Sequence, residues 1–180
     1  MVDVVEAYKD FRPPCNARDV VTDLLGNVPQ EHLAGLRSVV LTNSGALPGR
    51  RRRGWSWSRG RKARHTEVAG LYHGAWDGEE AWIELFVDQV VRGAPTWALR
   101  LPVVRSLLFG MVLFHEVGHH IHAVQRPEHR EREDVADDWQ RRLARTYLKR
   151  RHRLAGFVLR PLAQAIRAFR RRPRSPDAHR

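Results

Sequence analysis

His115, Glu116 and His119 form the pattern HExxH within one short stretch of the chain. Residues four apart lie one above the other on the same face of a helix, so the two imidazoles can bind one divalent metal ion. Glu116 is rotated around the helix and can reach a metal-bound water rather than the metal itself. A tetrahedral catalytic zinc takes a third protein ligand and keeps its fourth position for water. The pattern therefore predicts a water-activating metal site that needs one more ligand.

The third ligand has two candidates downstream of the motif, Glu133 and His129. Pro127 ends the preceding helix and allows the next one to lie beside it. Glu133 follows His119 by fourteen residues. Asp137 is one turn further on, where it could accept the free ring N–H of a ligand histidine and fix its tautomer. We favour Glu133 because it shares its helix face with Asp137.

The helix that carries the motif is expected at residues 102–124. Pro102 suits a first helical turn, and residues 103–114 leave almost no polar face. A helix that is apolar all round is buried, and buried polar groups are costly without partners. Metal binding would provide such partners. His120 and His122 point away from the metal face, where surface or hydrogen-bonding histidines are expected.

Strands are predicted before this helix. The run at residues 36–42 is rich in β-branched side chains, which is typical of a strand. Residues 67–76 and 81–88 alternate with a period of two around Asp77 and Gly78, a pair that favours a hairpin turn. The sheet is therefore expected to have one face against the helices.

Further helices are expected on both sides of this core. A single domain is predicted over residues 1–170, followed by a disordered basic tail at 171–180. The segment at 154–169 is amphipathic and rich in arginine; it either packs on the domain or contacts a membrane surface or a partner. The remaining helices are predicted at residues 3–11, 16–25 and 128–150.

The net charge is +12, and arginine carries most of it. A basic loop is expected at residues 44–65, where Arg50–Arg53 precede Trp55 and Trp57. Bases could stack on these rings while arginines hold phosphates, so nucleic acid or an anionic surface is one candidate partner. In the alternative interpretation, the charges are a solvated surface and the tryptophans pack the loop onto the domain or form part of a β-ribbon.

The expected compartment is the cytoplasm. Cys15 is the single cysteine, so no internal disulfide can form. The first residues lack the basic and apolar regions of a signal peptide. The apolar run at residues 107–114 is too short to cross a bilayer. A soluble protein without a transmembrane segment is therefore predicted.

HExxH followed by ExxAD at residues 133–137 resembles the gluzincin zinc metallopeptidases, and the short chain looks most like minigluzincins and ImmA/IrrE-type peptidases. The resemblance covers residues 36–147 by architecture, whereas the specific residues lie between His115 and Asp137. A metzincin would have Gly and His where this chain has His122 and Gln125, so that pattern fails. His129 would suit a His-rich variant such as the SprT-like proteins.

The resemblance implies a zincin-like α+β domain. A short mixed sheet of about three strands would pack on the HExxH helix and on the glutamate helix that follows it. It also implies Zn2+ bound by His115, His119 and Glu133, with Glu116 as the general base of peptide-bond hydrolysis.

A zinc metalloendopeptidase acting on a protein or peptide is thus the leading functional hypothesis. A peptide substrate could add as a strand beside the hairpin. The donor that stabilises the oxyanion has three candidates, Tyr72, His73 and Tyr147, with little to separate them. The alternative function is a nucleic-acid-associated or regulatory protein that uses a zinc-stabilised scaffold with little or no turnover.

Overall fold

The computed structural model describes residues 1–58, 61–125 and 132–151, without the side chains of residues 56–58, 61 and 62. His129, the expected helix at 154–169 and the expected tail at 171–180 lie outside the described residues. The chain divides into two compact units, Met1–Thr146 and Tyr147–Arg180. The fold described here is that of the first unit, and the single domain over residues 1–170 stays a prediction.

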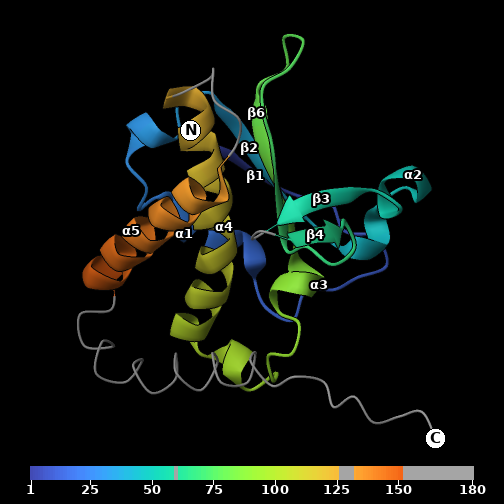
Figure 1. The fold of residues 1–180 in the computed structure, drawn as a ribbon. Coiled ribbons are helices and arrows are strands. Elements are labelled where there is room, and N and C mark those ends of the chain that lie inside the picture. Colours follow the sequence, from blue (N-terminus) through green and yellow to red (C-terminus); the bar gives the residue numbers. More distant parts are fainter. Residues whose placement is uncertain (59–60, 126–131, 152–180) are drawn as a thin grey trace, which may run out of the picture. The chain divides into compact units, whose positions relative to one another are not determined.

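A four-stranded mixed sheet lies at the centre of this unit, in the order β1–β2–β6–β5 (Figure 1). Its strands are β1 (Asp3–Glu6), β2 (Leu36–Thr42), β6 (Ala81–Phe86) and β5 (Gly70–His73). β1, β2 and β6 are parallel, whereas β5 pairs antiparallel with β6 and forms one edge of the sheet. The predicted strand at 36–42 and the predicted hairpin are confirmed, although both hairpin strands are shorter than predicted, at Gly70–His73 and Ala81–Phe86.

The two faces of the sheet carry different layers. Gly70 and Tyr72 lie opposite Leu85 and Ile83, and their face meets the helix α4 (Pro102–Gln125). Leu71 and Phe86 belong to the other face and join a small second core. This alternation follows from the period of two in strands, and it places α4 against one face only.

α4 is buried along its second half, where every residue from 112 to 122 is buried. It contacts β5, β6 and the helix α1 (Ala17–Leu25). The Asn16 side chain caps α1 by accepting a hydrogen bond from the backbone N–H of Asp19, 3.1 Å away. The next helix, α5 (Glu133–Arg151), begins at the glutamate of the predicted ExxAD.

The predicted helix at residues 3–11 is wrong, because this segment contains β1. Val4 and Val5 pair with Val39 and Val40 of β2 in a parallel ladder. Valine is stiff at χ1 and fits a pleated strand better than a helix. The pairing adds a fourth strand where about three were expected.

The expected basic loop at 44–65 contains ordered structure. Its elements are α2 (Gly49–Arg52) and the antiparallel ribbon of β3 (Trp55–Ser58) and β4 (Arg61–Arg64). The β-ribbon was one of the alternatives for this segment. A second core joins the ribbon to the outer face of the sheet, which is the face opposite α4. It consists of Leu47, Ala63, Val68 and Phe86.

Short helical turns complete the connections of the unit. The segment between β6 and α4 contains two of them. No helix in the described ranges combines the length and the apolar character needed to span a membrane. The turns are α3 (Val87–Val90), η1 (Gln30–His32), η2 (Ser44–Ala46) and η3 (Ala98–Arg100).

Candidate metal centre

α4 brings His115 and His119 together one helical turn apart. Their Nε2 atoms are 3.3 Å from each other, and both side chains are buried. Burial, together with the neighbouring His122, lowers the pKa of His119 to about 4, although Asp137 acts in the opposite direction. The imidazole of His119 is therefore neutral at physiological pH and keeps a lone pair for a metal ion.

α5 supplies a carboxylate to the same place. Glu133 has Oε2 3.5 Å from Nε2 of His115, and its Oε1 is 3.7 Å from Nε2 of His119. Donors bound to one tetrahedral zinc at its usual bond lengths lie about 3.4 Å apart. The three side chains thus form a cluster that can hold one metal ion.

Asp137 lies beside the cluster on the next turn of α5. Its Oδ1 is 3.1 Å from Nδ1 of His115, on the far side of the ring from the metal-facing nitrogen. A carboxylate this close to Nδ1 favours the tautomer with the proton on Nδ1, which leaves the lone pair of Nε2 for a metal ion. The structure therefore brings together four of the residues selected from the sequence.

The close crossing of α4 and α5 depends on Gly118. A Cβ added there would lie 2.8 Å from both Cα and the carbonyl oxygen of Ala136. These are backbone atoms that cannot move aside without displacing α5. Trp139 of α5 also lies next to Gly118, and its ring meets His32 of η1 edge to face, with ring centroids 4.8 Å apart. The absence of a side chain at Gly118 thus lets the start of α5 reach the two histidines.

A second glycine allows the edge strand β5 to pass close to Glu116. A Cβ on Gly70 would lie 2.8 Å from Oε1 of Glu116 and 2.7 Å from Cγ1 of Val112. Glu116 is buried at this contact. Sequence reasoning missed Gly70, although a glycine inside a strand is a signal of close approach.

The chain matches no family model, no curated protein and no solved structure. The chemistry assigned to the cluster is thus supported by its own geometry. Two histidines and a glutamate are one of the ligand sets of catalytic zinc, and they leave a coordination position for water.

Tyr72, the first candidate for the oxyanion donor, lies on the α4 face of the sheet and contacts His120. Its hydroxyl is 3.3 Å from Nδ1 of His120, and Nε2 of that ring is 3.0 Å from the carbonyl oxygen of Ala34. A carbonyl only accepts, so Nε2 carries the proton and Nδ1 accepts from Tyr72. Burial lowers the pKa of His120, against the effect of the Ala34 carbonyl. His120 is thus a buried, hydrogen-bonded histidine.

His73, the second candidate, belongs to the opposite face of the sheet. Its Nε2 is 3.2 Å from Oε2 of Glu84, and its ring stacks on Trp82 at a centroid distance of 3.9 Å. Arg51 also contacts the buried Glu84 carboxylate. Burial raises the pKa of Glu84, but the bonds from His73 and Arg51 outweigh it and keep that pKa below its ordinary value. The structure does not bring His73 to the metal cluster.

Tyr147, the third candidate, is buried and belongs to the second unit, whereas the metal cluster belongs to the first. Of the three candidates, Tyr72 alone shares the sheet face of Gly70, which meets Glu116.

Proposed function

We propose that this chain is a zinc-dependent peptidase with a zincin-like fold, of the gluzincin type. The observation that carries the proposal is the cluster of His115, His119 and Glu133, with donor atoms 3.3 to 3.7 Å apart on two crossing helices. Zinc suits a set of imidazoles and one carboxylate with a coordination position left open.

Each residue of the site would have a separate role in hydrolysis. A zinc ion held by His115, His119 and Glu133 would supply Lewis-acid chemistry, which lowers the pKa of water to near neutrality. Glu116, buried at the edge strand, would act as the general base that accepts a proton from the attacking water. The same carboxyl would then deliver the proton to the leaving amine. Asp137 would keep the imidazole ring of His115 in a fixed orientation throughout.

The sheet supports a peptide as the substrate. β5 is an edge strand, so one row of its backbone groups is available for pairing with another chain. Gly70 of this strand lies against Glu116. An extended peptide that adds beside β5 would therefore pass close to the proposed base.

The substitution Glu116→Gln tests this function. We expect the variant to retain bound zinc, because Glu116 is not a ligand, and to lose peptide cleavage by about 100-fold or more. Zinc content is measured by mass spectrometry of the purified protein, and cleavage is measured on a library of quenched fluorescent peptides. Equal cleavage by the wild type and the variant would end the assignment of the base.

The ligand assignment is tested in the same metal analysis. Glu133→Ala should lower the zinc content, whereas Asp134→Ala, at the next and exposed position, should leave it unchanged. Equal zinc content in both variants would show that Glu133 is not a ligand. Zinc that raises the melting temperature of a wild type that cuts no peptide would instead favour a metal-stabilised module without turnover.

A further inference from the structure

The segment between residues 49 and 64 contains seven arginines and one lysine but no acidic residue. The nearest acids along the chain are Glu31 and Glu67. The proposed peptidase mechanism does not use this segment. Its described elements are α2 and the ribbon of β3 and β4.

One arginine of this segment attaches α2 to the sheet. Arg51 forms an ion pair with Glu84, which is buried on the outer face of the sheet. Ala63 of β4 packs in the second core with Phe86 of β6. These two attachments hold α2 and the ribbon on the sheet, so the basic side chains are presented by a fixed scaffold.

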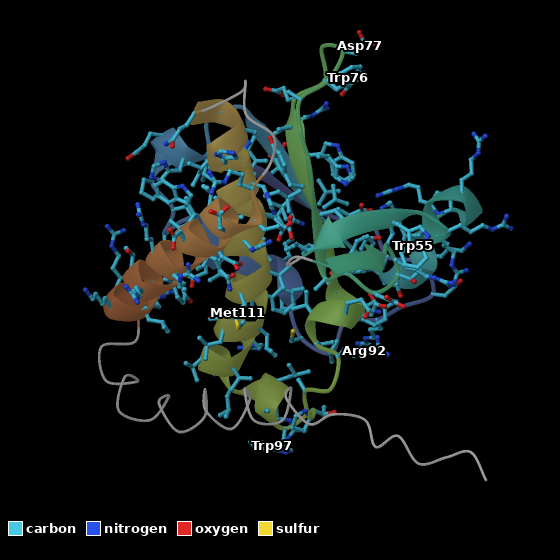
Figure 2. The ribbon with its side chains drawn as sticks, in the orientation of Figure 1. Trp55, Trp76, Asp77, Arg92, Trp97 and Met111 are labelled. Atoms are coloured by element: carbon cyan, nitrogen blue, oxygen red, sulfur yellow. The ribbon has the colours of Figure 1, made fainter. Side chains whose placement is uncertain are left out.

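The neighbouring arginines point outward. Arg50, Arg52 and Arg53 are exposed and form no ion pair with an acid among the residues that the structure describes. Trp55 follows them at the start of β3 and is 50% exposed (Figure 2). The guanidinium of Arg64 lies 5.2 Å from the centre of its ring. We call Arg50, Arg52, Arg53, Trp55 and Arg64 the basic ribbon surface.

We propose that the basic ribbon surface binds single-stranded nucleic acid. Its arginines match phosphate groups in charge and in hydrogen-bonding geometry, and the accessible indole of Trp55 offers a plane on which a base can stack. Stacking on a side chain requires a base that is not already stacked in a duplex. α2 has four residues, too few to read a major groove. The inference is independent of the metal centre.

The test is fluorescence anisotropy with the full chain and three labelled probes: an oligothymidylate, an oligouridylate and a duplex of equal length. We expect saturable binding of a single strand, tighter than that of the duplex. The preference between the two single strands shows whether DNA or RNA is the better ligand. Trp55→Ala should weaken binding at least about five-fold, the smallest effect typical of one lost base stack.

The salt dependence reports the phosphate contacts. Replacing Arg50, Arg52 and Arg53 by Gln should reduce the slope of log K against log salt by about 2, because each phosphate contact on a single strand contributes about 0.7. The matched control replaces Arg145, Lys149 and Arg150, three exposed cations of α5, by Gln. This control has the same change in net charge and should keep the wild-type slope.

Three results would overturn the proposal. The first is no binding of either single strand at low salt. The second is an equal loss of binding in the control variant, which would mean that the overall charge alone is responsible. The third is duplex binding as tight as single-strand binding with no effect of Trp55→Ala. If the protein binds phosphatidylserine vesicles but neither single strand, the first result applies. The basic ribbon surface would then be assigned to a membrane instead. Circular dichroism and the unchanged binding of zinc show that the variants are folded.

Discussion

At the scale of single residues, the two sides of the sheet use carboxylates in opposite ways. Glu133 faces the imidazoles of His115 and His119, a combination that attracts a cation. Glu84 faces Arg51 and His73, a combination already balanced within the protein. The buried Glu84 carboxylate with such partners holds structure together, whereas the partly exposed Glu133 carboxylate beside two histidines leaves room for an ion.

The lowered pKa of Glu84 makes this anchor dependent on pH. Because the folded protein favours the ionised carboxylate, its contribution to stability is present above the ordinary pKa of 4.5 and is lost as the pH falls below it. Glu84→Gln should therefore destabilise the protein at neutral pH, and the difference from the wild type should shrink in acid.

Chemical denaturation of the metal-free protein at neutral pH and near pH 3 measures this difference. Glu80→Gln, in the exposed turn of the same hairpin, is the control and should change stability little at either pH. A destabilisation by Glu84→Gln that is equal at both pH values would contradict the proposed role of its charge.

At the scale of elements, the crossing of α4 and α5 determines the metal site. Gly118→Ala should force α5 away from α4, because the new Cβ would overlap backbone atoms of Ala136. We expect a clear loss of zinc affinity, measured by competition with a chelating dye.

Gly110→Ala is a matched control on the same helix. Its Cβ would meet the side chains of Phe114 and Leu24 at 3.3 and 3.4 Å, which can adjust. An unchanged affinity in Gly118→Ala would mean that the crossing does not position Glu133.

The elements that the sequence predicted well are those with a local signal. The apolar run of α4 and the two-residue alternation around Asp77 each appear within one stretch of chain. Figure 2 shows Trp76 and Asp77 at the tip of that hairpin, where Trp76 is 83% exposed. The positive φ of Asp77 and Gly78, 50° and 83°, is the backbone geometry that this turn requires.

The elements that were mispredicted or missed depend on distant partners. β1 forms because Val4 finds Val39, thirty-five residues away, and no pattern within residues 3–11 reveals that pairing. The contact of Gly70 with Glu116 joins a strand to a helix across 46 residues of chain. The candidate ligands were accessible to sequence reasoning because two of them lie one helical turn apart and the third follows a single proline.

At the scale of the whole molecule, the proposed metal centre and the basic ribbon surface are built on opposite faces of one sheet. α4 and its histidines lie on one face, and α2 with Arg51 and the ribbon lie on the other. β5 and β6 contribute to both, since Tyr72 and His73 are neighbours that point in opposite directions. The two proposed activities can therefore be removed separately by mutation.

A metal ion bound by His115, His119 and Glu133 would also cross-link two helices that the chain joins through residues 126–132. Ligand binding stabilises a folded state by an amount set by the free ligand concentration, about 2.7 kcal/mol at one hundred times Kd. α5 has few buried side chains. Its packing against α4 would then depend on the concentration of free zinc. Chelation should make the chain more sensitive to proteolysis near the start of α5, so metal supply would control how long the protein survives as well as whether it reacts.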